Sequence, residues 1–121
     1  KIYLDAELEL EKIDFPFLAA LECLAPFGSS NPEPLFLATG VRPAAEPRWL
    51  KEKHLKVKLL QNGARHEAIY FNCPPDLPPP PWDIAFSPGE NHYQGRTSIQ
   101  LMLRGIRAAS GVERERDSKE F

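Results

Sequence analysis

The sequence lacks the features that mark a membrane protein or a disulfide-rich secreted domain. No apolar run approaches the ~20 residues that cross a bilayer, and no basic segment followed by an apolar one opens the chain. Only two cysteines occur, Cys23 and Cys73, and neither has a partner in CxxC spacing. We therefore expect reduced thiols, with no disulfide framework and no zinc site. The cytoplasm is the expected location.

The sequence also lacks the motifs of catalysis. It contains no GxSxG, no P-loop and no HExxH. The three histidines, His54, His66 and His92, are scattered without carboxylates at metal-ligand spacing. No catalytic residue, no metal ligand and no cofactor is therefore expected in this chain.

What is present fits one folded domain with an uneven charge. The chain has 121 residues, of which 42% are hydrophobic and 26% are charged, and its net charge is −2. Residues 1–40 hold two basic and seven acidic side chains, whereas residues 41–105 hold nine basic and six acidic ones. An acidic leader thus precedes a mildly basic segment, which favours an anionic partner. The first residue is Lys1, which indicates a piece of a longer protein.

The N-terminal third predicts a strand, a short helix and a connector. Apolar and acidic residues alternate over residues 2–10, as in a half-buried strand. Asp14 precedes Phe15-Pro16, a helix start signal. The apolar face of this helix would comprise Phe17, Leu18, Leu21 and Leu24. Pro26 and Gly28 would end it, and the proline-rich residues 26–34 would form a loop.

The remainder predicts five strands. Residues 35–41 suit a buried strand, and residues 42–53 a long loop. Residues 54–59 alternate, which would turn Leu55, Val57 and Leu59 toward a core. Asn62-Gly63 would join this strand to residues 65–72 in a hairpin.

After the hairpin, residues 74–81 contain six prolines and predict an exposed polyproline-like connection. A fourth strand would span residues 82–86, and residues 88–96 would form a loop. A fifth strand would span residues 97–106, with one face made by Ile99, Leu101 and Leu103 and the other by Gln100, Met102 and Arg104.

This order of elements predicts a mainly β fold, a five-stranded OB-fold barrel preceded by a short N-terminal helix. An SH3-like barrel or a partial sandwich stays open. The expected organisation is an N-terminal strand, helix and connector in residues 1–34, the barrel in residues 35–107, and a frayed, charged tail in residues 108–121.

An OB fold binds ligands across its second and third strands and the loops beside them. Those places hold interleaved cations and aromatic rings, as single-stranded nucleic acid requires for phosphates and bases. The candidates are Arg42, Arg48, Trp49, Lys51 and Lys53 in the first loop, Lys56 and Lys58 on the second strand, Tyr70 on the third, and Asn91, Tyr93 and Arg96 in the last loop. Trp49 and Tyr93 could instead fill the barrel.

One segment resembles a known family. Residues 24–34, LAPFGSSNPEP, resemble the LxPFGxxNPEP segment that leads into the OB domain of RecJ, the single-stranded-DNA-specific exonuclease. Residues 54–56 resemble its HLK strand, residues 68–71 its AIxF strand, and residues 91–101 its NxWxGxxxxQL turn and strand, with Tyr93 in place of the Trp. The resemblance covers residues 2–107.

The resemblance implies the DNA-binding part of a longer nuclease. RecJ proteins carry catalytic DHH and DHHA1 domains that use two Mn²⁺ or Mg²⁺ ions for 5′ to 3′ hydrolysis in DNA repair and recombination. Those motifs do not occur here, so the metal belongs to the missing domains. The matched positions imply Lys56, Lys58, Tyr93, Arg96 and Gln100 as DNA-side residues, and Arg104 on the fifth strand completes the candidate set.

The implied partners are single-stranded DNA, the catalytic DHH domains of the parent chain and a single-strand-binding protein. No membrane partner is expected. The alternative is a scaffold or protein-interaction module that docks on the catalytic domains or on a single-strand-binding protein, with the proline run as the docking segment.

Overall fold

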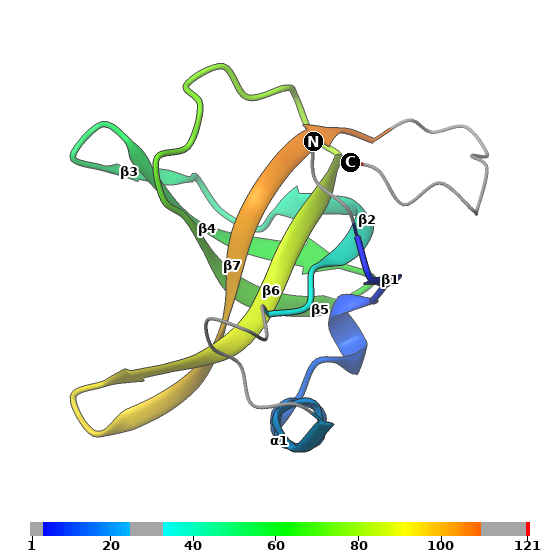
Figure 1. Cartoon of the computed structure of the whole chain (residues 1–121). Coiled ribbons are helices and arrows are strands. Elements are labelled where there is room, and N and C mark those ends of the chain that lie inside the picture. Colours follow the sequence, from blue (N-terminus) through cyan, green and yellow to red (C-terminus); the bar gives the residue numbers. More distant parts are fainter. Residues whose placement is uncertain (1–3, 25–32, 110–120) are drawn as a thin grey trace.

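Strands dominate the part of the chain that the computed structural model describes, residues 4–24, 33–109 and 121 (Figure 1). In chain order the elements are β1 (Ala6–Glu7), the 3-10 helix η1 (Leu10–Lys12), α1 (Phe15–Leu24), β2 (Phe36–Pro43), β3 (Arg48–Leu50), β4 (His54–Gln61), β5 (Ala64–Tyr70), β6 (Trp82–Tyr93) and β7 (Arg96–Ala108). The prediction of a mainly β fold with one short α-helix is confirmed. Most of the predicted connector and residues 110–120 of the predicted tail lie outside the described residues, whereas Ala108, expected in the frayed tail, is the last residue of β7.

The strands form one sheet with the order β1-β2-β6-β7-β5-β4-β3, in which β2 also pairs with β4. The pairs β2–β4, β4–β5, β5–β7, β7–β6 and β6–β2 therefore return to their starting strand, and five strands make a ring. The described sheet has seven strands because the two short strands β1 and β3 add to β2 and β4 outside this ring.

The core lies inside the ring, where alternate side chains of each strand meet. Leu55 and Leu59 of β4, Phe86 of β6, and Leu101 and Leu103 of β7 are all buried. Because successive side chains of a strand point to opposite faces, the residues between them face outward. The predicted inward faces of residues 54–59 and 97–106 are thus confirmed.

Strand β2 is irregular around Gly40. Its register with β6 shifts between Ala38, which pairs with Ile84, and Val41, which pairs with Trp82. Gly40 has a φ of +65°, a left-handed conformation that costs other residues about 1–2 kcal/mol. Its N–H donates to Oδ1 of the buried Asp83 at 3.2 Å. This bend lies just before the end of β2, where Arg42 pairs with Leu60 of β4.

The turn at Asn62-Gly63 joins β4 to β5, as predicted. Both residues have positive φ, 49° and 86°, the type I′ geometry that matches the twist of a two-residue hairpin. Seven consecutive pairs follow, from Gln61 opposite Ala64 to Leu55 opposite Tyr70. The turn therefore sets the register of the central hairpin.

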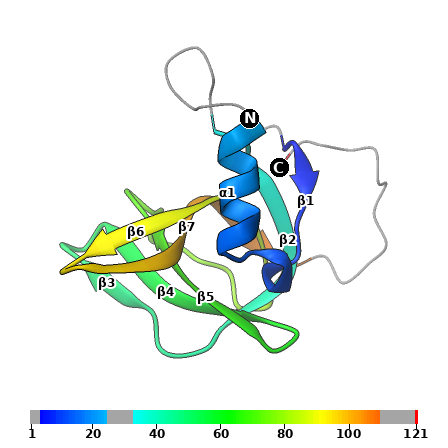
Figure 2. The ribbon, with the colours of Figure 1, turned by 90° about the horizontal axis from the view of Figure 1, so that it is seen from below.

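Helix α1 starts where the sequence predicts. The Asp14 Oδ1 accepts a hydrogen bond from the backbone N–H of Phe17 at 2.8 Å, which caps the helix. Leu18 is buried, and the ring of Phe17 lies edge-on to Phe36 of β2 at 6.3 Å. Figure 1 shows the helix below the strands, and in Figure 2, which is seen from below, it lies in front of them. Leu24, expected on the apolar face, is 82% exposed. No described helix is long and apolar enough to cross a membrane.

Two predicted loops contain strands. Residues 42–53 hold β3, and residues 88–96, expected to be irregular, extend β6 and β7 into a long hairpin arm that turns at Gln94-Gly95. Both turn residues have positive φ, 50° and 76°. The arm has no apolar alternation because solvent reaches both of its faces, so periodicity gave no strand signal.

The proline run, expected to be an exposed connection, is attached to the core near its middle, at Leu77 and Pro78. Leu77 packs against the core, and the indole N–H of Trp82 donates to the Pro78 carbonyl at 2.7 Å. Trp82 itself is 2% exposed. The apolar Leu77 and a hydrogen-bond acceptor in the right place therefore attach the run to the sheet.

The acidic N-terminal segment is held by one buried amide. Gln61 Oε1 accepts from the Leu10 N–H, and its Nε2 donates to the Thr39 carbonyl, both at 2.7 Å. His66 Nε2 lies 3.0 Å from the Leu10 carbonyl, which can only accept, so this nitrogen carries a proton. The segment reaches these contacts through η1, so within residues 4–10, the described part of the predicted strand, only Ala6–Glu7 is a strand.

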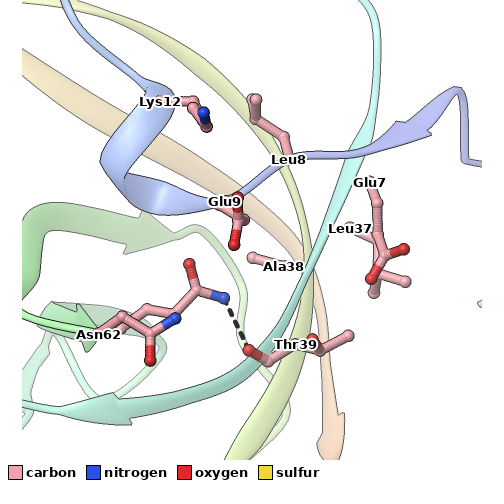
Figure 3. Close-up of a pocket in the computed structure, with 9 residues that line it drawn as sticks. Glu7, Leu8, Glu9, Lys12, Leu37, Ala38, Thr39 and Asn62 are labelled. Atoms are coloured by element: carbon pink, nitrogen blue, oxygen red, sulfur yellow. Dashed lines mark hydrogen bonds between the residues drawn. The ribbon is translucent and has the colours of Figure 1, made fainter. Parts of the chain in front are cut away.

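Figure 3 shows the groove of about 520 Å³ beside this amide. The Gln61 side chain bonds to Thr39 at its base, while Glu9 and Lys12 line it from the N-terminal segment.

We expect Gln61→Ala to lower the free energy of unfolding, because it leaves the Leu10 N–H and the Thr39 carbonyl without their partner. Each buried group left unpaired costs about 1–3 kcal/mol. Urea unfolding monitored by far-ultraviolet circular dichroism measures the change. Gln100→Ala, on a half-exposed strand position, is the matched control and should unfold as the original chain does. Equal stability of the two variants would contradict the assigned role of Gln61.

Candidate nucleic-acid interface

The outward side chains of β3, β4, β5 and β7 form rows across the sheet. Arg48 pairs with Lys56, Lys56 with Ile69, and Ile69 with Met102. Directly opposed residues of neighbouring strands share a face, and Lys56 lies between the inward Leu55 and Val57. This row therefore lies on the outside of the ring.

A second row runs parallel to the first. Lys58 pairs with Glu67, and Glu67 with Gln100. Arg104 is exposed further along β7, beside the register shift between β6 and β7. The structure thus brings four of the predicted site residues, Lys56, Lys58, Gln100 and Arg104, to one surface.

The hairpin arm continues this surface. Two residues before Gln100 on β7, Ser98 pairs with Asn91, and two residues earlier Arg96 pairs with Tyr93. By strand alternation Asn91, Tyr93 and Arg96 share the face of Gln100. Tyr93 is 67% exposed, so its ring does not fill the interior. We call the following set the outer face: Arg48, Lys56, Lys58, Asn91, Tyr93, Arg96, Gln100 and Arg104.

The tip between β3 and β4 flanks the outer face. Lys51 and Lys53 are exposed there, and the Lys53 N–H donates to the Leu50 carbonyl at 3.1 Å to close the turn. In Figures 1 and 2 this tip and the β6–β7 arm project to the same side of the molecule. Arg42 is exposed near the end of β2, where it pairs with Leu60.

Two predicted site residues lie on the opposite face. Trp49 pairs with Leu55, and Leu55 with Tyr70, so both aromatic residues share the inward face of Leu55. Trp49 is 40% exposed beyond the ring, and Tyr70 packs against the core. Tyr70, predicted as a DNA-side residue on the third strand, thus lies on the opposite face from Lys56 and Lys58, because the hairpin register places Ile69 and Glu67 beside those lysines.

The environment of Tyr70 is apolar. Burial raises the pKa of the Tyr70 phenol, Cys73 raises it further, and Arg104 lowers it. The Tyr70 hydroxyl donates to the Arg104 carbonyl at 3.2 Å. Burial likewise raises the pKa of the Cys73 thiol, whose Sγ lies 3.3 Å from the Pro74 carbonyl. Both groups are therefore neutral at physiological pH.

We expect the two cysteines to react with Ellman's reagent at different rates. Cys23 is exposed, whereas Cys73 is buried with a raised pKa, so little of it is the reactive thiolate at neutral pH. The rate of the slow thiol should increase as the pH approaches its raised pKa. Cys73→Ser should remove the slow phase, and Cys23→Ser the fast one. A single fast rate for both thiols would contradict the burial of Cys73.

Arg65 is a residue of this surface that sequence reasoning missed. It pairs with Leu60, alternates with Glu67 and is exposed on the outer side of β5. Arg65 is the second residue after the Asn62-Gly63 turn. Because the turn fixes which β5 residues face outward, this position could have identified it. With Arg65, the outer side of these strands holds six cations, Arg48, Lys56, Lys58, Arg65, Arg96 and Arg104, against the carboxylate of Glu67.

No metal centre accompanies this surface. Within residues 4–24 and 33–109, no group of three or more His, Cys, Asp or Glu side chains is arranged to hold a metal ion. The residues present therefore do not fit the pair of Mn²⁺ or Mg²⁺ ions that the family resemblance implies for the catalytic domains.

Comparisons with known proteins agree with this architecture. The family model described as RecJ OB domain matches residues 4–105. Two crystal structures of RecJ from Thermus thermophilus are similar to the chain. The one in complex with Mn²⁺ has a TM-score of 0.65 and 27% identity over 93% of this chain, and the one in complex with Mg²⁺ has 0.60 and 29% over 80%. The chain spans 15% to 16% of their lengths. No curated protein sequence matches it.

Proposed function

Because the chain belongs to the RecJ OB domain family, we propose that it binds single-stranded DNA on its outer face. The observation that carries this proposal is the gathering of six cations on the outer side of β3, β4, β5 and β7, one of which, Arg96, pairs with the exposed Tyr93. Clustered Lys and Arg side chains attract the phosphate backbone, and an exposed ring offers a stacking platform for a base.

We propose further that the ring of five strands is the OB barrel. Its pairs run β2-β4-β5-β7-β6 and return to β2, with β5 and β7 parallel. An OB fold binds its ligands on the second and third strands between two flanking loops. Here β4 and β5 take that place, and the β3–β4 tip and the β6–β7 arm flank them.

The strand of DNA would lie across the rows of the outer face. Lys56 and Lys58 would neutralise phosphates, and the planar guanidinium of Arg96 would hold a phosphate through two N–H donors. A base would stack on Tyr93, with Asn91 and Gln100 as hydrogen-bond partners nearby. Because phosphates carry no sequence information and every base has a flat face, sequence preference would be slight.

The chain would act as one part of a longer protein, since it spans about one sixth of the RecJ structures it resembles. We propose that this protein is a RecJ-like 5′ to 3′ exonuclease of the cytoplasm, active in DNA repair and recombination. The OB domain would hold the single strand and present it to the catalytic domains, which would supply the Mn²⁺ or Mg²⁺ chemistry.

We expect Lys56→Glu and Lys58→Glu to weaken binding of a fluorescein-labelled oligo(dT), and the double variant to bind about tenfold or more weakly. Each variant loses a phosphate contact, so the slope of log Kd against log salt should fall by about one per residue. Fluorescence anisotropy at several salt concentrations measures both quantities.

Lys12→Glu is the matched control for these variants, because Lys12 is exposed on η1, away from the outer face. It changes the net charge equally and should leave the affinity nearly unchanged. Absence of binding by the original chain at low salt, or binding that ignores salt, would falsify the proposed function.

We expect the 121-residue chain alone to leave DNA intact. Its described residues offer no cluster for a catalytic metal pair. Incubation of a 5′-labelled single strand with the chain and Mn²⁺, followed by a denaturing gel, checks this. Metal-dependent shortening that co-purifies with the chain and disappears with EDTA would contradict the assignment of catalysis to other domains.

A further inference from the structure

A groove of about 420 Å³ opens at the edge of the outer face, between β5 and the start of β7. It is lined by Phe15, Lys58, Arg65, His66, Glu67, Thr97, Ser98 and Ile99. We propose that this groove receives one nucleotide of the bound single strand, with its base on Phe15 and its phosphate between Lys58 and Arg65. The proposal rests on the proposed function and adds a binding subsite to it.

The groove exists because β5 and β7 pair over a short stretch. Their register includes Glu67 with Gln100, Ala68 with Leu101, and Ile69 with Met102. Before these pairs, β5 stays paired with β4, and β7 with β6, so the facing edges of the two strands separate. Backbone N–H and C=O groups at such free edges can bond to the polar edge of a base.

Phe15 supplies the flat surface. It is the first residue of α1, and 44% of it is exposed, whereas Phe36 and Phe86 are buried. The capped start of the helix holds its backbone in place. Stacking of a base on such a ring contributes about 1–3 kcal/mol when measured by alanine substitution. Contact with a base is therefore more favourable for the exposed Phe15 ring than contact with water.

The charges of the groove determine where the phosphate and the base of the nucleotide would lie. Lys58 and Arg65 are both exposed and carry two positive charges, whereas Glu67 carries one negative charge. A phosphate would be repelled by Glu67 and attracted by the two cations. The carboxylate of Glu67 can instead accept a hydrogen bond from an N–H of the base, such as the N3–H of thymine. His66 is held by the Leu10 carbonyl and adds its ring to the wall.

The groove is continuous with the outer face. Lys58 belongs to both, and Glu67 connects Lys58 to Gln100 across the sheet. A single strand that follows the row from Arg96 through Gln100 to Lys58 would therefore reach the groove without leaving the protein surface. A volume of about 420 Å³ lies within the ~300–1,000 Å³ range of small-molecule sites.

Binding of oligo(dT) to the 121-residue chain and its variants tests the proposal. Phe15→Ala and Phe15→Leu should each weaken binding about fivefold or more with an unchanged salt slope, because they remove a stacking ring and no charge. Phe15→Leu keeps the apolar volume at the helix start, so it serves if Phe15→Ala fails to fold. Arg65→Glu should weaken binding and reduce the salt slope by about one, whereas Lys12→Glu should do neither.

A second readout locates the base. An oligo(dT) that carries one 2-aminopurine should change its fluorescence on binding at one position along the strand, and Phe15→Leu should abolish that change. Wild-type affinity in the Phe15 and Arg65 variants would overturn the subsite while leaving the proposed function intact. Loss of all binding by the original chain would refute the function itself. A shift in oligomeric state of the variants with unaltered DNA binding would assign the groove to a second copy and would also overturn the proposal.

Discussion

The ring of strands closes at β2, which pairs with β6 from Phe36 to Val41 and with β4 through Arg42 and Pro43. Between Ala38 and Val41 its register with β6 shifts, and the strand bends there. Gly40 makes the bend with a positive φ, and the buried carboxylate of Asp83 accepts its N–H. Arg107 Nε lies 3.8 Å from the other oxygen of that carboxylate. The carboxylate of Asp83 on β6 thus contacts both β2 and β7 where the ring closes.

The outer face follows from this closure. Once the ring is closed, each strand has one face committed to the core, and its alternate residues must face solvent. The Asn62-Gly63 turn then aligns Lys56 and Lys58 with Ile69 and Glu67, and the parallel pairing of β5 with β7 adds Met102 and Gln100. Cations that are scattered over half of the sequence are collected into two rows by hydrogen-bond register.

How far the sequence predicts this site depends on the kind of signal each residue carries. Leu55, Val57 and Leu59 alternate with polar residues, so their burial and the exposure of Lys56 and Lys58 could be predicted. Ile69 and Tyr70 are adjacent in the sequence, and both carry large hydrophobic side chains, so alternation does not show which of them faces the core. Only the register with β4 shows that Ile69 faces outward. The hairpin arm could not be predicted from periodicity because solvent reaches both of its faces, although Gln94-Gly95 is the turn that a hairpin needs.

The ring has two seams with few registered pairs. β2 and β4 share two pairs, next to the stretch of β2 that the Gly40–Asp83 hydrogen bond holds, and β5 and β7 share three pairs and then separate. Free strand edges and the exposed ring of Phe15 are unfavourable features in an isolated domain, since edges invite pairing and apolar surface avoids water. Their position beside Lys58 and Arg65 gives them a use, because a nucleotide could satisfy the free edges, cover the ring and neutralise the cations at once.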